Sequence, residues 1–510
     1  VFARCLACCV LAGCSPSENI DTKNSAEVPL TVQQREKVDS LLASMTVQQK
    51  VAQTIQGEIK HVSPDDLRRY GLGSVLNGGG SCPNNNKDST LEDWVALADA
   101  YRQASLDQLG GSAGIPVLWG TDAVHGHNNV IGATLFPHNI GLGAANDPEL
   151  IGKIGRITSR EVAATGIDWI FAPTVAVPLD DRWGRTYEGY SDRPEIVRAY
   201  AGVIVSALQS EGLLATAKHF FGDGGTYRGI DQGDTRGSIE TLLEIHGQGY
   251  YSALDGGVTS VMASFNSING SKIHGDKSIL DDLLRDQLGF EGFTIGDWNG
   301  HGQVPGCTNE SCAQAIKAGM DMVMVPEDWK ALLLNTVAQV ESGVISEGRV
   351  DEAVRRILTA KMKAGLFDAP MPSAKAVPLQ ANLGSEEHRI VAREAVRKSM
   401  VLLKNNGSVL PISGSAEVLV AGSGANSIEM QTGGWTITWQ GRGNSNETFP
   451  GATSIYAAID QALTGMGGSA TLSVDGSYTK RPDVAVVVFG ETPYAEGHGD
   501  VDTLAWQQED

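Results

Sequence analysis

The sequence predicts an α/β protein built as a (β/α)8 barrel followed by a second α/β sandwich domain. The chain has 510 residues, too many for one ordinary hydrophobic core, so at least two domains are expected. Short apolar runs alternate with amphipathic helical stretches over residues 32–368, as they do in repeated βα units. Seven or eight such units in one stretch are typical of a parallel barrel.

The first 14 residues, VFARCLACCVLAGC, indicate the end of a secretory signal. The stretch is apolar, carries one Arg and is too short to cross a bilayer. Residues 11–14 resemble the lipobox of bacterial lipoproteins, in which the Cys is lipidated after cleavage, and Ser15 after it favours sorting to the outer membrane. We therefore expect an exported protein, periplasmic or anchored to the outer membrane, with residues 15–31 as a polar tether. The alternative is an ordinary signal peptide that happens to contain Cys.

Eight runs are candidates for the barrel strands. Each is short and buried in character, with β-branched or aromatic residues. Periodicity does not separate a closed barrel from an open, doubly wound sheet, which stays the alternative fold. The first run is the weakest of the eight. In chain order they are Ala52–Gly57, Gly73–Leu76, Pro116–Gly120, Trp169–Pro173, Leu214–Phe220, Ser260–Phe265, Phe293–Gly296 and Asp321–Val325.

The pattern changes after the barrel. Residues 349–366 place apolar side chains on one face and predict its last helix. Prolines interrupt residues 369–384, which we interpret as a linker. Ser385 is a plausible N-cap for the helix that opens a second domain over residues 385–510. This domain has two strand-like runs, Glu417–Ala421 and Asp483–Phe489, and no closing helix after the second, so we expect it to be C-terminally truncated.

Composition and net charge limit the classes of molecule that the protein is expected to bind. The fractions of hydrophobic and charged residues, 41% and 19%, are those of a folded soluble protein. The net charge of −21 repels nucleic acid and anionic membranes, which leaves a lipid anchor as the expected membrane contact. No metal-ligand cluster, phosphate-binding glycine loop or nucleotide motif stands out, so no cofactor and no metal site are predicted. A neutral substrate fits this balance, although an acidic surface kept for solubility explains it equally well.

Two cysteines lie close together outside the leader. Export implies an oxidising compartment, which makes Cys307 and Cys312 a candidate disulfide across the loop PGCTNESC. Two free thiols are the alternative, because so small a ring adds little stability. Cys82 has no obvious partner.

Polar side chains follow the predicted strands where these strands end. In a barrel, the carboxyl ends of the strands face the active-site mouth. Asp297 comes directly behind the buried run 293–296, where it has little structural purpose. Any one such residue could equally be a helix cap or a satisfied ion pair. Several converging on one rim favour a catalytic site, and the candidates are Asp122, Arg185, Lys218, His219 and Asp297.

Long blocks of the sequence resemble glycoside hydrolase family 3. The similarity runs in order from about Asp39 to the last residue, which makes a chance match untenable. The stretch around Asp297, GFTIGDWNG, resembles the family's nucleophile strand, and AKHFFGDGGT resembles its Lys-His sugar-binding motif. Further matching blocks are WGTDAVHGHNNVIGATLFPHNIGLGA, DDRWGRTYEGYSDRPEIV, DEAVRRILTAKMKAGLFD and AREAVRKSMVLLKNNGSVLPI.

The resemblance implies a role for each candidate residue. Asp297 would be the nucleophile that forms a covalent glycosyl-enzyme, and a second carboxyl group would act as acid and then base. That second group would come from FGETPYAEGHGD, where Glu496 matches the family's position better than Glu491. Trp298 and Trp439 would form an aromatic subsite, and for Trp435 core packing is equally plausible. Sugar hydroxyls would be bound by Asp122, Arg185, Lys218 and His219.

The implied activity is that of a retaining, exo-acting β-glucosidase or exo-1,3/1,4-β-glucanase. It would release glucose from the non-reducing ends of β-glucans or gluco-oligosaccharides. A β-xylosidase of the same family, or a glycan-binding lipoprotein fragment without activity, are the alternatives. A β-N-acetylglucosaminidase is disfavoured, because residues 218–225 lack the Pro and second His of that subgroup's loop. The sequence leaves open the preferred linkage, the chain length and the oligomeric state.

Overall fold

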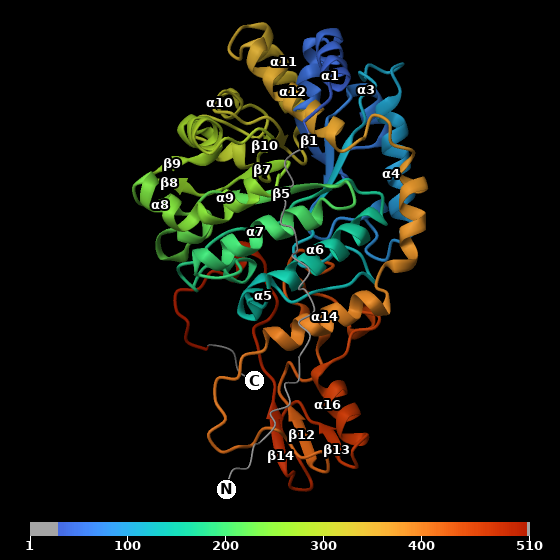
Figure 1. Cartoon of the computed structure of the whole chain (residues 1–510), viewed down its shortest axis with the longest axis vertical. Helices are drawn as coiled ribbons and strands as arrows, with labels where there is room; N and C mark the ends of the chain where they lie inside the picture. The colour runs from blue at the N-terminus through green and yellow to red at the C-terminus, as the bar shows by residue number, and fades with distance from the viewer. Residues whose placement is uncertain (1–28, 507–510) are drawn as a thin grey trace, which may run out of the picture.

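A computed structural model describes residues 29–506 of the chain (Figure 1). The predicted leader and lipobox of residues 1–14, and most of the predicted tether, lie outside the described residues. Helix α1 (Val32–Ser44) begins the folded part, with Thr31 and Gln34 forming a capping box. Within residues 29–506, none of the helices has the length and apolar character needed to span a bilayer.

Eight parallel strands form the barrel, which confirms the predicted fold. Their order around the sheet is β10-β7-β5-β4-β3-β2-β1-β11. An isolated parallel bridge between Ile295 and Met322 joins the two end strands and closes the ring. The strands are β1 (Ile55–Glu58), β2 (Ser74–Asn77), β3 (Leu118–Thr121), β4 (Trp169–Ile170), β5 (Leu214–Phe220), β7 (Ser260–Ala263), β10 (Phe293–Ile295) and β11 (Val323–Met324).

Every predicted run overlaps one of these strands, although the first was placed too early. Residues up to Gln53 belong to helix α2 (Val47–Gln53), which Thr46 caps, and the strand begins only at Ile55. The helical signal of the Thr46–Gln49 capping box outweighs the apolar character of Val51 and Ala52.

Helices surround the barrel, and the core therefore has two parts. One apolar cluster fills the barrel interior, with Trp169, Phe171 and Phe293 among its members. A larger cluster packs the outer faces of the strands against the helices. The helices include α3 (Pro64–Tyr70), α4 (Leu91–Leu106), α5 (Asn139–Ala145), α6 (Pro148–Ala163), α7 (Pro194–Leu208), α8 (Ile239–His246), α9 (Gln248–Asp255), the π-helix η6 (Ser278–Gln287), α10 (Ala313–Lys317), α11 (Trp329–Glu341) and α12 (Glu347–Lys363).

Two prolines of the predicted linker, Pro372 and Pro378, begin helices rather than interrupt structure. Pro372 occupies the first turn of α13 (Pro372–Ala376), where its missing N–H costs nothing. A 3-10 helix, η8 (Val377–Asn382), follows. The predicted cap is confirmed, since the Ser385 side chain accepts a hydrogen bond from the His388 N–H at the start of α14 (Glu386–Ser399). The domain boundaries themselves stay predictions.

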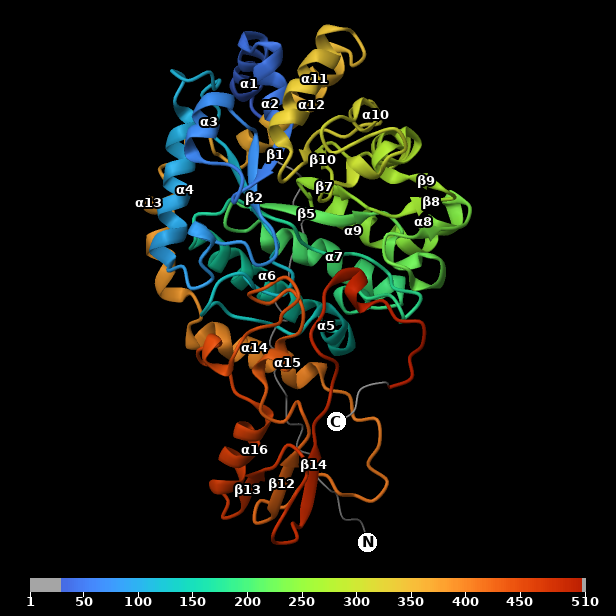
Figure 2. The same ribbon diagram turned by 180° about the vertical axis from the view of Figure 1, so that it is seen from behind.

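The second unit is a small parallel sheet with helices. Strands β12 (Glu417–Ala421) and β14 (Val484–Val487) coincide with the two predicted runs. A third strand, β13 (Ser469–Leu472), was missed, because SATL is half-exposed and weakly apolar. Helix α16 (Ile455–Thr464) packs next to β13. Figure 2 shows the segment after β14 leaving this sheet and running up to the barrel.

Candidate active site

A cavity of about 400 Å³ opens at the carboxyl ends of the barrel strands, and all eight predicted site residues line it. Asp122 follows β3, Lys218 and His219 end β5, and Asp297 follows β10. Trp298 directly follows Asp297, Arg185 comes from the loop before α7, and Trp439 and Glu496 come from the second unit. The lining residues are Lys60, Gly78, Gly79, Ser81, Asp122, Phe171, Arg185, Lys218, His219, Gln232, Met262, Phe265, Asp297, Trp298, Gln303, Met324, Trp435, Trp439 and Glu496.

Asp297 is held from both its backbone and its side chain. Its N–H donates to His274 Nε2 at 2.9 Å, and its Oδ1 accepts the Trp298 N–H at 2.7 Å. Burial raises the pKa of Asp297 to about 6, while the charge of Arg185 acts in the opposite direction. The carboxylate is therefore ionised at neutral pH and fixed in one orientation.

Glu496 reaches the same cavity from the second unit. It begins the 3-10 helix η10 (Glu496–Gly499), with a left-handed φ of 56°. Its Oε1 lies 3.4 Å from Arg185 Nη1. Burial, reinforced by the negative charge of Asp297, raises the pKa of Glu496 to about 8. Two carboxyl groups with separated pKa values thus share one cavity, which is the arrangement that acid–base chemistry at neutral pH requires.

Glu491, the alternative to Glu496, lies elsewhere. It is exposed and accepts the Tyr494 hydroxyl at 2.8 Å. It is absent from the residues that line the cavity.

Charged partners orient the polar wall of the cavity. Lys218 Nζ donates to Asp122 Oδ1 at 2.8 Å. Arg185 Nη2 donates to His219 Nε2 at 3.1 Å, and because Arg can only donate, this ring nitrogen is an acceptor. His219 Nδ1 therefore carries the proton and donates to Asp223 Oδ2 at 2.9 Å. Burial and the nearby cation Arg185 keep the pKa of His219 well below its usual value, so the ring is neutral.

Aromatic rings make the outer walls, and a glycine run makes room for them. A Cβ on Gly78 would lie 2.6 Å from Trp298 Cζ3, and one on Gly79 would lie 3.0 Å from Trp435 Cζ3. Trp435 is 6% exposed, and its Nε1 donates to Glu188 Oε1 at 3.0 Å, so it is a packed wall. Trp439 is 37% exposed and is free to meet a ligand at the mouth.

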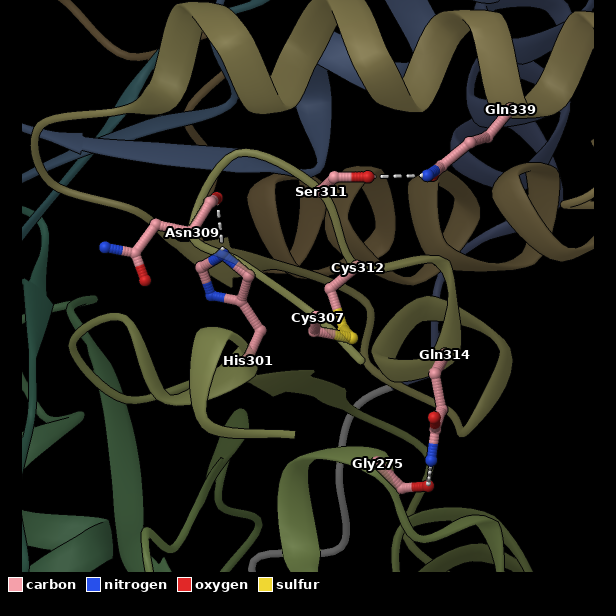
Figure 3. The surroundings of a disulfide bond; sticks show 8 residues. All are labelled: Gly275, His301, Cys307, Asn309, Ser311, Cys312, Gln314 and Gln339. Atoms are coloured by element: carbon pink, nitrogen blue, oxygen red, sulfur yellow. Dashed lines mark hydrogen bonds between the residues drawn. A yellow bond between two sulfur atoms is a disulfide. The ribbon is translucent and has the colours of Figure 1, made fainter. Parts of the chain in front are cut away.

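A disulfide closes the loop between η7 (Gly300–Gln303) and α10 (Figure 3). Cys307 and Cys312 are bonded, which decides between the two alternatives for these thiols. The same loop is tied to α11 by the hydrogen bond from Gln339 Nε2 to Ser311 Oγ at 2.9 Å. Cys82 is free and buried.

Comparisons with known proteins agree with this geometry. Residues 46–360 match the glycosyl hydrolase family 3 N terminal domain, and residues 400–510 match the C-terminal domain of the same family. The chain belongs to glycosyl hydrolase family 3. The two matched regions cover most of the chain and include Asp297 and Glu496.

Three similar proteins are, by name, a β-glucanase and two β-glucosidases. The crystal structure of an exo-1,3/1,4-β-glucanase from a Pseudoalteromonas species superposes with a TM-score of 0.93 at 53% identity, covering 95% of this chain and 62% of that one. A lysosomal beta glucosidase of Dictyostelium discoideum is 30% identical over 92% of this chain and 62% of its own length. A periplasmic beta-glucosidase of Salmonella typhimurium is 29% identical over 85% and 55%, respectively. The chain thus spans about three fifths of the length of these relatives.

Several residues of this family 3 site escaped the sequence analysis. Glu188 is fully buried and grips Arg185 through two hydrogen bonds of 2.9 and 3.0 Å. His274 accepts the backbone N–H of the predicted nucleophile. The signal that could have found the aromatic wall is the glycine run NGGGS at the end of β2, since consecutive glycines behind a strand indicate a close approach.

Proposed function

We propose that the chain is a retaining, exo-acting β-glucosidase or exo-β-glucanase that releases glucose from the non-reducing ends of β-glucans or gluco-oligosaccharides. The observation that carries this proposal is the pair Asp297 and Glu496 in one cavity, with pKa values of about 6 and about 8. At pH 7 the first is a carboxylate and the second is a carboxylic acid, as a nucleophile and an acid must be.

Each carboxyl group has one part in a two-step reaction. In the first step Asp297 attacks C1 of the terminal sugar, the bond from C1 to the glycosidic oxygen breaks, and Glu496 gives its proton to that oxygen. Trp298 holds Oδ1, so we assign the attack to Oδ2. In the second step Glu496 takes a proton from water, the water oxygen bonds to C1, and the Asp297 carboxylate leaves. Two inversions at C1 give β-glucose.

The polar wall accounts for recognition of a terminal sugar. An ionised Asp122 can accept two hydroxyls, and its ion pair with Lys218 fixes its direction. Arg185 is held by the buried Glu188, so its guanidinium is oriented before substrate arrives. Charge-assisted hydrogen bonds of this kind each contribute about 1.5–3 kcal/mol. A closed, polar first pocket favours chain ends over internal residues.

Product analysis on laminari- and cello-oligosaccharides tests the proposal. We expect glucose as the first and only monosaccharide, released in the β form as followed by NMR. The appearance of α-glucose first, or of long fragments without glucose, would contradict it. Comparing aryl β-glucoside with aryl β-xyloside separates the β-xylosidase alternative, and no turnover of either would favour a binding protein.

Replacing Trp439 with Ala should raise KM for laminaribiose and cellobiose together. Stacking on a sugar face depends on apolar contact and weakly on which hydroxyl carries the linkage. An aryl β-glucoside should be affected less, because most of its binding lies in the first pocket. Steady-state kinetics on the three substrates provide the check, with the buried Trp329→Phe as a control for general loosening of the barrel. A variant that loses only one linkage would show that directional contacts control the second subsite.

The pH profile of kcat/KM should be bell-shaped, with limbs near pH 6 and pH 8. Below about pH 6 the Asp297 carboxylate is protonated and no longer attacks, whereas above about pH 8 Glu496 has lost the proton it must donate. The basic limb should disappear in Glu496→Ala measured on an activated aryl glucoside. Persistence of that limb in the variant would assign it to another group.

We also propose that the protein is exported. The Cys307–Cys312 disulfide supports an oxidising compartment, and one relative is periplasmic by name. Attachment through a lipidated Cys14 is part of the same proposal. Metabolic labelling with a fatty acid, compared between the chain and Cys14→Ser, tests the anchor.

A further inference from the structure

The loop that carries Glu496 belongs to the second unit but is attached to the barrel. Within its own unit, Ala495 exchanges two hydrogen bonds with the Gln440 side chain, at 3.0 and 3.3 Å. Towards the barrel, the Tyr187 hydroxyl donates to the Tyr494 carbonyl at 2.6 Å. The position of Glu496 over the cavity therefore depends on contacts with both units.

Asp500 makes the most specific of the barrel contacts. Its Oδ1 accepts the Gly184 N–H at 2.9 Å, and its Oδ2 accepts the Asp231 N–H at 2.8 Å. Both donors are backbone groups of the barrel, on two different loops. The Val501 N–H adds a bond to the Arg182 carbonyl at 3.1 Å. One carboxylate thus joins the end of η10 to two barrel loops, four residues after Glu496.

The barrel is shaped to admit this loop at close range. A Cβ on Gly184 would lie 2.1 Å from the Glu496 carbonyl oxygen and 2.8 Å from the Asp500 nitrogen. No real side chain is tolerated at such distances, so the loop reaches this depth only over a glycine. Arg185, the next residue, lies 3.4 Å from Glu496 Oε1. The barrel segment that binds the loop is therefore the one that meets the carboxyl group.

We propose that Asp500 is a positioning residue that latches the Glu496 loop onto the barrel and places the carboxyl group against the glycosidic oxygen. This inference rests on the proposed role of Glu496 as acid and base. Proton transfer needs the donor within hydrogen-bond reach of the leaving oxygen. A displacement of about 1 Å can lower a rate by about 100-fold. Without the Asp500 carboxylate, the loop keeps the Tyr187 and Val501 bonds to the barrel but loses the two that flank Glu496 most closely on the η10 side, and this allows such a displacement.

Kinetics of Asp500→Ala with substrates of different leaving groups test the latch. On cellobiose, whose leaving group needs protonation, kcat/KM should fall by up to about 100-fold. On 2,4-dinitrophenyl β-glucoside, whose leaving group does not, the fall should be far smaller. The basic limb of the pH profile should move to lower pH, because a loosened loop hydrates Glu496 and favours its ionised form. A role in folding alone would not produce this selectivity or this shift.

Three variants complete the design. Asp502→Ala is the matched control, since the Asp502 side chain is 99% exposed and lies 3.8 Å from Arg228 Nη2, and it should change neither substrate's kinetics. Asp500→Asn keeps the size of the side chain but points an N–H at one of the two backbone donors. We therefore expect it to show the same preference between the two substrates as Asp500→Ala, but more weakly. It replaces Asp500→Ala if that variant folds poorly. Glu496→Ala gives the largest difference between the two substrates that loss of the acid can produce.

The outcomes separate the latch from the function it rests on. The latch alone would be overturned if Glu496→Ala lowers kcat/KM mainly on cellobiose, whereas Asp500→Ala and Asp500→Asn lower it equally on both substrates or on neither. A Glu496→Ala that shows no selectivity would overturn the acid–base role and the latch with it. We expect Glu496→Ala and Asp500→Ala to lower kcat/KM on cellobiose far more than on the aryl glucoside, and Asp502→Ala to change neither value.

Discussion

Asp297→Ala should abolish turnover of every glucoside while leaving the fold intact. Removing the nucleophile of a covalent mechanism lowers kcat by about 10⁶-fold in hydrolases. The side chain contributes little to the structure, since its Oδ1 accepts a hydrogen bond from the backbone N–H of Trp298, the next residue. Steady-state rates on an activated aryl glucoside measure the loss of turnover, and circular dichroism and the melting temperature show whether the fold is intact.

A second readout identifies the role of the missing group. Azide added to Asp297→Ala should attack C1 from the face that Asp297 vacates and give the α-glucosyl azide. Asp282→Ala, a change at a half-exposed carboxylate on η6 that pairs with Lys277, should leave turnover as it is. Retention of substantial activity in Asp297→Ala, or formation of the β-azide by this variant, would remove Asp297 from the nucleophile's position.

Glu496→Ala should slow the enzyme by an amount that depends on the leaving group. General acid catalysis contributes about 10²–10⁴-fold, so oligosaccharides should lose about that much. Activated aryl glucosides leave without a proton, and their first step should be almost unchanged. Azide should restore turnover and give the β-glucosyl azide, because it attacks the glycosyl-enzyme without needing a base.

Glu491→Ala is the matched control for this change. Glu491 lies on the same segment but is exposed and bonded to Tyr494. We expect its replacement to leave both classes of substrate unaffected. The leaving-group signature in Glu491→Ala, and its absence in Glu496→Ala, would show that the acid was assigned to the wrong residue.

The barrel could be predicted because its strands are buried on both faces. Strand β5 is buried at every position, and the mainly apolar start of its sequence, LATA, is a signal that needs no knowledge of neighbours. Strand β13 lacked the signal, because its residues are half-exposed and its identity as a strand depends on pairing with β12. The start of β1 was misplaced because a helix cap precedes it.

The residues of the candidate site also fall into those that the sequence could predict and those that it could not. Asp297 and Lys218 lie at strand ends, where residue type and position together indicate chemistry, and the structure brings them into one cavity. His274 and Asp500 act through contacts with other segments of the chain, and Glu188 joins its neighbour Arg185 to Trp435, 247 residues away. Asp500, for example, contacts Gly184 across 316 residues. Nothing local distinguishes such residues from ordinary polar ones, so only the folded chain reveals them.

Trapping the glycosyl-enzyme is the most direct measurement of the central claim. A 2-deoxy-2-fluoro-β-glucoside with an activated leaving group should inactivate the chain, because the fluorine slows both steps while the activated leaving group keeps the first one fast. Mass spectrometry should then find one 2-deoxy-2-fluoroglucosyl group per chain, on the peptide that contains Asp297. A label on a different carboxylate, or continued turnover of other glucosides with no label at all, would contradict the account.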